Sequence, residues 1–415
     1  MQNNLINLLS GDVLSYSWEK NGQYIDSKIN LEDFLENIKE NYFAVRYRIF
    51  ILFDDETINY EIPNEDILLT GSYNENYQNG QRRTLSFSLY NNENKYTPGI
   101  NNLWAGTKIS FELGIELIDD STVWFKKGIY VISKIDPQLS ASQSLVQISA
   151  NDKFSLFENR TGILDTSYEI PAGSDIEDII NVIKLKDSGS GSPLDPQPII
   201  YHSSFKGKTT QIAISKNAGE SFASILLDLA TQISAEIFYN SVGQLTIVPN
   251  GEVTQDDDKP LLGIYNFDKA DFETLNFSFD LNSIINKIIV MGTGNNGAVC
   301  KAIAVNDDPG SPLCYQRIGY RTGEIINDSN ITTDYLAQER ADYELRSQLI
   351  LKSSTSIDIL INPFLEVNNL IAINCEFFDL KMARFIIQSI SFNLNYTGTM
   401  NLSISNIKNI KALTR

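Results

Sequence analysis

Residue types that could perform chemistry are sparse in this chain of 415 residues. It contains one histidine, His202, which stands between Tyr201 and Ser203. A zinc site with two imidazoles and an H-E-x-x-H protease each need more than one histidine, and no G-x-S-x-G elbow or P-loop is present. We therefore interpret His202 as a surface or packing residue and not as a catalytic base.

The cysteines and the glycine-rich and acidic runs lack the spacing of a metal or cofactor site. Cys300, Cys314 and Cys375 include no C-x-x-C pair, and three cysteines cannot all pair within one chain, so we expect reduced thiols. The GTGNNG run at 292–297 lacks dinucleotide-site spacing and is interpreted as a flexible turn. The run QDDDK at 255–259 is interpreted as a solvated loop, with calcium binding as the alternative. We predict neither a cofactor nor a metal.

Two further kinds of site stay open in the sequence. The chain has 52 acidic residues, so a pair of carboxylates for a muramidase-type glycosidase could exist, but the sequence does not single one out. Exposed aromatic side chains on loops would suit carbohydrate binding, and Tyr96, Trp104 and Trp124 are the candidates. Each of these three residues stands near a strand pattern, which favours core packing instead.

Charge and composition narrow the class of protein. The 33 basic and 52 acidic side chains give a formal net charge of -19, which disfavours sequence-specific DNA binding, although an acidic surface also simply keeps proteins soluble. Hydrophobic residues make up 42% of the chain, enough for several folded domains. The start MQNNLINLLSGD has no signal-peptide pattern, and no run of about 18 apolar residues occurs. We expect synthesis in a cytoplasm and no membrane span.

The first third of the chain predicts an arm followed by a β domain. Residues 1–40 end in the helix-like INLEDFLENIKE and are interpreted as an N-terminal docking arm. Residues 41–157 show apolar residues at every second position, which predicts an antiparallel sandwich or barrel of five or more strands. The first strand places Val45, Tyr47, Ile49, Ile51 and Phe53 on one face, followed by a turn at Asp54 and Asp55.

The middle of the chain predicts a small α/β module over residues 158–275. Ser174 and Glu177 have capping-box spacing at the start of a helix. Residues 184–198 are rich in Gly, Ser and Pro and predict an exposed loop without regular structure. A second helix in GESFASILLDLATQ is followed by a hairpin that turns at Gly243.

The remainder predicts a connector and a second β region. Residues 276–351 contain the strand IINKIIVMG, loops with GTGNNGAVCK and DDPGSP, and a helix from about Thr333 to Leu351. In that helix Ala337, Ala341, Leu345 and Leu349 form a narrow apolar line. Residues 352–415 contain four strand patterns and are expected to pack with 276–292. The predicted fold class is α+β and mainly β, with two antiparallel tube-like domains of sandwich or barrel type flanking the α/β module.

Spaced motifs in this order resemble those of phage baseplate hub proteins, also called tail-associated structural proteins. In residues 79–136, the family's W-x-G-x-x-(apolar) and W-F-x-x-G-x-(apolar)-x-I patterns are matched by Trp104, Gly106, Ile109, Trp124, Phe125, Gly128, Tyr130 and Ile132. A following strand with an aspartate, a basic residue and an apolar turn is matched by Asp152, Lys153, Phe154 and Leu156. The last region is similar to the family's second tube domain, with Asn368 and Asn369 where many relatives have a glycine-aspartate turn.

The resemblance covers residues 41–410 and implies a structural role without catalysis. It implies a homotrimeric ring of six tube-like domains that adapts a hexameric tail tube to a threefold tip. The implied partners are the tail tube or distal tail protein, the tape measure protein and a central spike or fibre, in a virion tail through which DNA passes unbound. The alternatives are a tail-associated peptidoglycan hydrolase and a host-glycan-binding adhesin.

Overall fold

The computed structural model describes most of the chain. The described residues are 4–7, 13–21, 23–25, 42–101, 103–140, 143–158, 160–187, 189, 191–249, 261–269, 271–277, 284–294, 297–311, 313–328, 331–352, 355–378, 380–396 and 398–406. They form two compact units, each built from separate stretches of chain. Unit 1 comprises Met1–Gly251, Ile361–Glu366 and Ile390–Met400, and unit 2 comprises Glu252–Leu360, Val367–Ser389 and Asn401–Arg415. The predicted helix of the docking arm and the QDDDK run lie outside the described residues.

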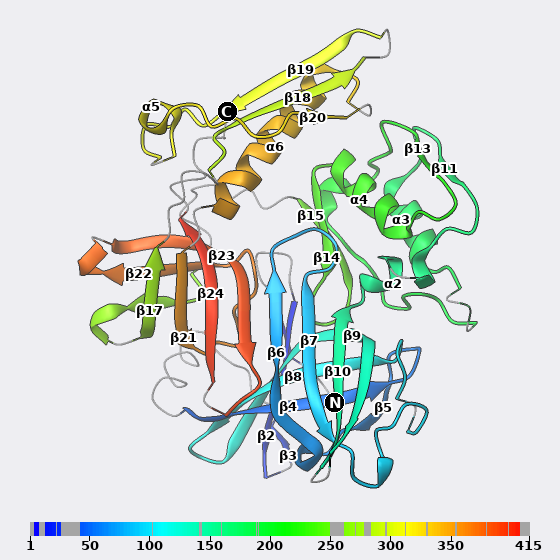
Figure 1. The fold of residues 1–415 in the computed structure, drawn as a ribbon, viewed down its shortest axis with the longest axis vertical. Helices are drawn as coiled ribbons and strands as arrows, with labels where there is room; N and C mark the ends of the chain where they lie inside the picture. Colours follow the sequence, from blue (N-terminus) through cyan, green and yellow to red (C-terminus); the bar gives the residue numbers. More distant parts are fainter. Residues whose placement is uncertain are drawn as a thin grey trace. The chain divides into compact units, whose positions relative to one another are not determined.

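Unit 1 is built on an antiparallel sheet, as the period-two pattern predicts (Figure 1). Its strands in spatial order are β6 (Ile67–Asn76), β7 (Arg83–Tyr90), β10 (Ser144–Asp152), β9 (Ser121–Leu139), β8 (Lys108–Leu117), β4 (Tyr42–Leu52) and β5 (Ile58–Glu61). Short 3-10 turns occur at η1 (Asn64–Asp66) and η2 (Asn92–Asn94). The sheet does not close into a barrel, because β5 pairs with β4 and with no other described strand. The mainly β, α+β fold class is confirmed.

The apolar face predicted for the first strand is confirmed at four of its five positions. Val45, Tyr47, Ile49 and Ile51 are at most 4% exposed, whereas Phe53 is 48% exposed. The prediction was wrong for Phe53 because β4 ends at Leu52 and the turn at Asp54 and Asp55 has already begun, so the alternation no longer applies.

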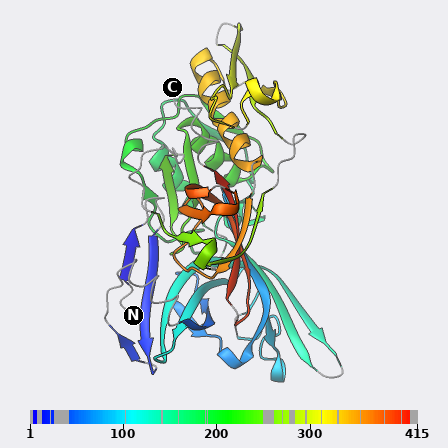
Figure 2. The same cartoon turned by 90° about the vertical axis from the view of Figure 1, so that its left-hand side faces the viewer.

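Two features extend this sheet. The strands β1 (Asn4–Asn7), β2 (Val13–Lys20) and β3 (Gln23–Ile25) form a small ladder in which β2 pairs with β9. The hairpin of β9 and β10 reaches beyond its neighbours, as Figure 2 shows, and carries Leu139 with 86% of its surface exposed.

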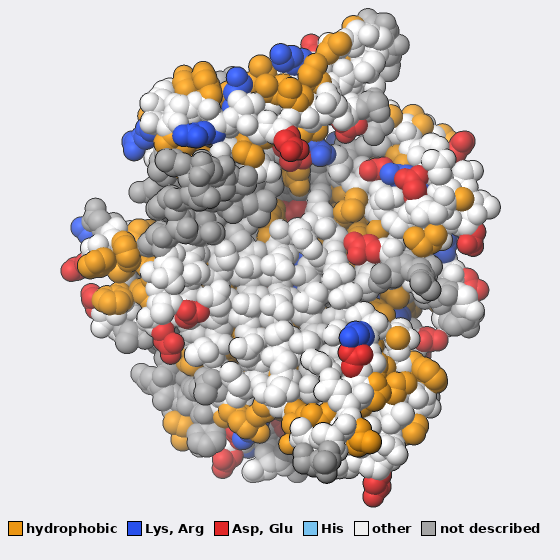
Figure 3. Space-filling view, in the orientation of Figure 1, with side chains coloured by type: hydrophobic (Ala, Val, Ile, Leu, Met, Phe, Trp, Pro, Cys, Tyr) orange, Lys and Arg blue, Asp and Glu red, His pale blue; other side chains and the backbone are white. Residues whose placement is uncertain are grey.

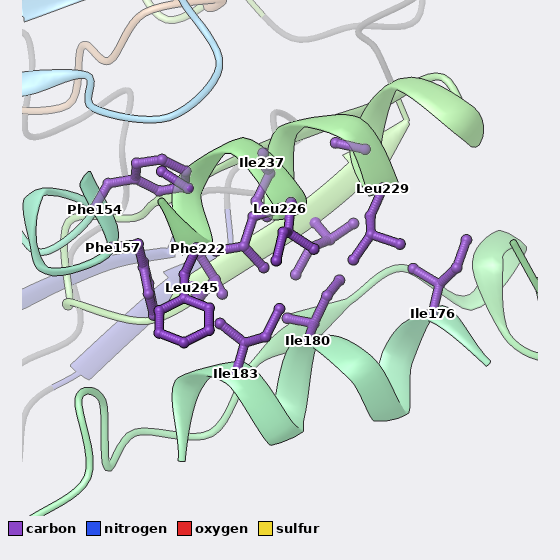
Figure 4. Packing of buried hydrophobic residues seen from close by; sticks show 14 of the residues in the cluster. Phe154, Phe157, Ile176, Ile180, Ile183, Phe222, Leu226, Leu229, Ile237 and Leu245 are labelled. Carbon is purple, nitrogen blue, oxygen red and sulfur yellow. The ribbon is translucent and has the colours of Figure 1, made fainter. Parts of the chain in front are cut away.

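The part of unit 1 from residue 155 to residue 249 is a module of helices and short strands, whereas residues 261–275 of the module predicted over 158–275 belong to unit 2. Its helices are α2 (Ser155–Glu158), α3 (Ile176–Lys184) and α4 (Phe222–Gln232), with 3-10 turns η3 (Arg160–Gly162) and η4 (Ser203–Phe205). Its strands are β11 (Tyr168–Ile170), β12 (Ile200–Tyr201), β13 (Ile214–Lys216), β14 (Ala235–Tyr239) and β15 (Leu245–Pro249). Figure 4 shows side chains of α3 facing those of α4 across a core that also includes Phe154 and Phe157. The apolar faces read from the sequence therefore pack against each other.

Two local predictions in this module were wrong. The N-cap of α3 is Asp175, whose side chain accepts a hydrogen bond from the Asp178 N–H, and the Ser174 hydroxyl donates instead to the Pro171 carbonyl. The loop at 184–198 is not exposed throughout, because Leu194 and Asp195 are at most 2% exposed. Asp195 is buried against groups from distant segments, which local composition does not report.

The cap assignment gives a direct prediction. Replacing Asp175 with alanine is expected to lower the free energy of unfolding by about 1 kcal/mol, because the first turn of α3 loses the acceptor for an N–H group. The matched variant Ser174→Ala is expected to cost clearly less than Asp175→Ala. Urea unfolding of both variants measures the difference, and a larger loss for Ser174→Ala would restore the capping box predicted from the sequence.

Unit 2 contains two groups of strands. In the first, β17 (Phe272–Phe277), β21 (Thr355–Leu360), β24 (Thr399–Asn406) and β23 (Leu380–Asn393) are neighbours in that order. In addition, β22 (Leu370–Cys375) pairs with β23 and with the parallel strand β16 (Ile264–Asn266), and the 3-10 turns η5 (Phe267–Lys269) and η6 (Glu376–Phe378) follow β16 and β22. The four strands predicted after residue 352 are confirmed. Asn368 has a φ of 67°, a left-handed conformation that asparagine tolerates, so it fits the turn for which the resemblance implies a glycine.

The second group packs a three-stranded sheet on one helix. The sheet consists of β19 (Val299–Val305), β18 (Lys287–Thr293) and β20 (Ile326–Asn327). Its strands β19 and β18 pack on α6 (Asp334–Lys352), and α5 (Tyr315–Ile318) lies in the connection between β19 and β20. The apolar line of α6 is confirmed, with all four side chains fully buried. The predicted loop after residue 292 was wrong in part, since GAVCK enters β19, which pairs with β18 in a hairpin. Within the described part of the chain, none of the helices combines the length and apolar character needed to cross a membrane.

Candidate functional site: an uncharged polar face backed by buried ion pairs

The outward face of β6, β7 and β10 carries uncharged polar side chains over most of the paired part of the three strands, and Leu68, Tyr90 and Leu145 lie at one end of it. Successive side chains of a strand point to opposite faces of the sheet. In β7 this buries Leu85, Phe87 and Leu89, while the residues between them point outward. The outward residues that we call the polar face are Ser72, Asn74, Thr84, Ser86, Ser88, Gln147, Ser149 and Asn151. Figure 3 shows a broad uncharged area over β6 and β7.

The strand register places these side chains in rows. Ser86 stands opposite Ser72 on one side and Ser149 on the other, and Thr84 stands between Asn74 and Asn151 in the same way. The Ser86 hydroxyl oxygen accepts a hydrogen bond from the Ser72 N–H at 3.0 Å. These eight side chains offer short neutral hydrogen-bonding groups and no fixed charge, and the neighbouring Lys134 of β9, which stands opposite Ser149, is paired with Asp136. The face therefore offers no unpaired cation to a phosphate backbone.

The opposite side of the same strands buries a network of four charged side chains. Arg83 of β7 contacts Glu75 of β6 and Glu366 at 2.7 Å each, and Lys127 of β9 contacts the other oxygen of Glu366 at 2.7 Å. These side chains are at most 3% exposed, and Arg83 also donates to the Tyr239 carbonyl. Two cations and two anions make the network neutral, which is the condition for burying charge at acceptable cost.

The pKa of Glu366 reflects this arrangement. Burial by itself would raise it, but the Lys127 ammonium and the Arg83 guanidinium outweigh burial and hold the pKa of Glu366 at about 2. Glu366 is therefore ionised in the folded chain at neutral pH, and the network depends on both cations.

A second buried network joins the sheet to the α/β module. The Lys153 ammonium lies 2.6 Å from Glu56 and 2.6 Å from Asp195, all with fully buried side chains. Lys108 contacts the same Glu56 oxygen at 3.0 Å, and the Tyr239 hydroxyl donates to Asp195 at 2.8 Å. Burial and the Asp195 carboxylate raise the pKa of Tyr239 well above its usual value, so this hydroxyl stays protonated.

A third set of contacts fixes the β6–β7 hairpin to the module. Arg82 contacts Glu236 of β14 at 2.7 Å, and both side chains are at most 3% exposed. The Asp152 carboxylate accepts the N–H groups of Arg82, Arg83 and Phe154 at 2.7, 2.9 and 3.0 Å. Burial raises the pKa of Asp152 to about 6 although these donors oppose the shift. The sheet that carries the polar face is therefore held by three sets of buried contacts: the two charged networks and the contacts of Arg82 and Asp152.

The residues predicted from the family motifs occupy structural positions, mostly inside this sheet. Trp124, Phe125 and Phe154 are buried, and Asp152 is the hydrogen-bond acceptor just described. Gly128 has a φ of 139°, and a Cβ there would lie 2.8 Å from the Tyr130 ring. The motif thus brings Gly128, Asp152 and Phe154 close to the buried networks, while its assignment to a family role stays a prediction.

The aromatic residues considered as glycan contacts divide into two groups. Tyr96 is fully buried and Trp124 is 4% exposed, with the Arg48 guanidinium 3.9 Å above its ring. Core packing is confirmed for these two residues. It was wrong for Trp104, which is 57% exposed because it lies in the loop before β8 and rests on Gly99.

The remaining candidates for chemistry do not assemble into a site within the described residues. His202 is exposed and its Nδ1 accepts the Ser204 N–H at 3.2 Å, so the prediction of a surface histidine is confirmed. Cys300, Cys314 and Cys375 are free, as predicted, and all three are buried. No group of three or more metal-ligating side chains occurs in the described part of the chain.

The sequence analysis identified Lys153 through its motif but did not identify the other charged residues of the buried networks, such as Arg83 and Glu366. Arg83 alternates in register with Leu85, Phe87 and Leu89, and this period is the pattern that could have placed it on the buried face. Glu366 carried no comparable indication, because its partner Arg83 is 283 positions away in the sequence.

Comparisons with known proteins identify solved structures with a similar fold. Residues 310–410 match the family model described as Domain of unknown function (DUF5048). No curated protein matches the sequence significantly. Among solved structures, the tail protein from Neisseria meningitidis MC58 aligns with a TM-score of 0.58 and 11% identity, covering 89% of this chain and 99% of that chain.

Two further solved structures agree with this similarity. The 43 kDa tail protein of prophage MuSo2 from Shewanella oneidensis aligns with a TM-score of 0.57 and 15% identity, covering 89% of this chain and 100% of that chain. A chain of the Francisella PdpA-VgrG complex aligns with a TM-score of 0.51 and 11% identity, covering 91% of this chain and 61% of that chain. The resemblance to tail proteins read from the sequence is confirmed at the level of the fold.

Proposed function

Taking as premise the fold that this chain shares with phage tail proteins, we propose that it is a structural subunit of a phage-type tail tip or baseplate. The observation that carries the proposal is the near-complete mutual coverage with two tail proteins, since a domain shared by chance would align over a fraction of their lengths. The proposed location is the virion tail, after assembly in the host cytoplasm.

The finer proposal is a homotrimeric ring that continues the tail tube and adapts it to a threefold tip. Its proposed partners are the tail tube or distal tail protein, the tape measure protein and a central spike or fibre. The Francisella relative is described in a complex of PdpA with VgrG, which supports a partner at one end of such a ring. The role is structural and without turnover, and lysis of purified cell wall by this chain alone would favour the peptidoglycan-hydrolase alternative instead.

We place the polar face on the lumen side of this ring. A wall of serine, threonine, asparagine and glutamine side chains lets a polyanion pass without ion pairing. The overall charge of -19 adds a repulsive field that acts in the same direction. The buried networks behind the face keep its strands in place while load passes along the tail.

The ring is tested by measuring the mass of the purified chain in solution. Light scattering is expected to give three times 46.6 kDa, and class averages in electron microscopy are expected to show threefold symmetry with β6, β7 and β10 facing the channel. A two-fold or four-fold particle, or a ring with the polar face outside, would contradict the proposal. If the isolated chain is a monomer, the same measurement is repeated with a co-expressed tail tube protein, and a monomer there would overturn the ring.

The chemistry of the face gives a second prediction. Replacing Ser72, Ser86 and Ser149 together with lysine is expected to create salt-dependent binding of duplex DNA to the assembled ring, because one row of each subunit then offers three cations. Affinity should fall steeply between about 50 and 200 mM salt. The control adds the same charge at the exposed positions Asn92, Asn101 and Gln211, which lie outside the polar face. Equal DNA binding by both variants would contradict the placement of the polar face in the lumen.

A further inference from the structure

A cavity of about 840 Å³ lies in unit 1, where the segment before β8, the end of β10 and the helix α2 meet. Its volume is within the range of small-molecule sites, roughly 300–1,000 Å³. Polar side chains line much of its wall. Those that decide its chemistry are Asp54, Lys108, Ser133, Asn151, Ser155 and Thr161.

Three hydroxyl groups of the wall already donate their protons in hydrogen bonds to backbone carbonyl groups. Ser133 donates to the Ser149 carbonyl at 3.0 Å, Ser155 donates to the Asp152 carbonyl at 2.8 Å, and Thr161 donates to the Leu156 carbonyl at 3.1 Å. A hydroxyl group has one proton and two lone pairs. Each of these oxygens is therefore left with acceptor capacity only.

Asn151 adds a group that can both donate and accept. It is half-buried at the end of the polar face, and its side-chain amide forms no hydrogen bond with another described residue. An amide beside a cavity is fully used when a ligand presents both a donor and an acceptor to it.

The charges of the wall disfavour an anionic ligand. The Lys108 ammonium donates to the Asp54 carbonyl at 3.1 Å and pairs with Glu56 at 3.0 Å, so its charge is balanced from behind. The exposed Asp54 carboxylate remains as the acidic group of the wall. The polar groups of the wall are thus mostly acceptors with a slight negative charge, set among apolar residues such as Val131, Ile132 and Leu156, and a ligand with hydroxyl donors and an apolar ring face complements them.

An exposed indole stands next to the cavity in the chain. Trp104 directly precedes the lining residues Ala105 and Gly106, and its backbone N–H donates to the hydroxyl of the lining residue Thr107 at 3.0 Å. Its ring is 57% exposed, and aromatic rings offer a flat apolar surface on which a ligand can stack.

We propose that this cavity binds a saccharide, held by hydroxyl donation to Ser133, Ser155, Thr161 and Asp54 and by a reciprocal contact with Asn151. The site does not depend on ring formation by the subunit, because all lining residues belong to unit 1 of one chain.

The proposal is tested by isothermal titration calorimetry of the full chain with chitotriose and maltotriose as probes. At least one of them is expected to bind, and Asn151→Leu is expected to weaken binding about tenfold or more, since it removes a donor and an acceptor together. Thr161→Val, which keeps the shape of the side chain, should weaken binding several-fold. Asn76→Leu is the matched control, because Asn76 is an exposed asparagine of the same sheet outside the cavity.

Each remaining outcome decides against the proposal. If neither trisaccharide nor soluble cell-wall glycan binds at millimolar concentration, the cavity has no saccharide function. If binding survives both Asn151→Leu and Thr161→Val in chains whose thermal unfolding is unchanged, the saccharide binds elsewhere. Preferential binding of ethanolamine or inorganic phosphate would assign the cavity to a different ligand class. A ring that forms without saccharide binding would leave the proposed structural function intact while overturning this site.

Discussion

Replacing Arg83 with methionine is expected to lower the free energy of unfolding by about 3–5 kcal/mol, one of the two largest effects of a single substitution predicted for this protein. Arg83 is 1% exposed and contacts Glu75 and Glu366, both with fully buried side chains. Methionine leaves Lys127 as the remaining cation of the network, so one carboxylate of the pair loses its compensation. Denaturant unfolding monitored by tryptophan fluorescence measures the loss.

The control is an ion pair of similar length at the surface. Lys20 and Asp119 lie 2.8 Å apart, with side chains 42% and 58% exposed, so Lys20→Met is expected to cost at most about 1 kcal/mol. A double variant that adds Glu75→Gln to Arg83→Met should recover part of the lost stability, because the two buried charges that remain, Lys127 and Glu366, then compensate each other. A loss below 1 kcal/mol for Arg83→Met would show that the network is not closed to water.

The same network predicts a pH dependence. The pKa of Glu366 is lowered from 4.5 to about 2 in the folded chain, so the folded state favours the ionised carboxylate. Its contribution to stability is fully present above about pH 4.5 and is lost as the pH falls toward 2. The Glu366→Gln variant should therefore show a weaker loss of stability over this window than the unmodified chain, and equal slopes would contradict the network.

Replacing Lys153 with methionine is the second change with a large expected effect, again about 3–5 kcal/mol. Lys153 is the common partner of Glu56 and Asp195, and it also donates to the Gly243 carbonyl at 2.9 Å. Its loss leaves Asp195 with the Tyr239 hydroxyl and the Gln197 N–H, and Glu56 with Lys108. Because these residues join the sheet to the α/β module, the thermal transition should also broaden or split.

Lys216 provides the matched control for Lys153. It contacts Asp228 at 2.8 Å within the same module, but the two side chains are 16% and 40% exposed. The variant Lys216→Met is therefore expected to lose at most about 1 kcal/mol and to keep a single transition. If both lysine variants lose the same stability, burial does not set the strength of the second network.

The elements of this fold could be predicted because each depends on residues close together in the sequence. The alternation in β7 and β8 and the four-residue spacing of Ala337 to Leu349 in α6 mark a buried face whatever lies against it. Predictions failed where the burial of a residue depends on residues that are distant in the sequence but close in space. Asp195 lies in a stretch whose composition indicates an exposed loop, yet Lys153 and Tyr239 enclose it.

The candidate site likewise combines features that local sequence predicts with features that depend on tertiary structure. The sequence by itself determined that β7 has a hydroxylic face and an apolar face, because side chains of a strand alternate across the sheet. The tertiary structure alone decided that β6 and β10 flank β7 and extend its hydroxylic face into rows. It also decided that Arg83 meets Glu366, since the energy of a buried charge depends on partners that folding brings from distant parts of the chain.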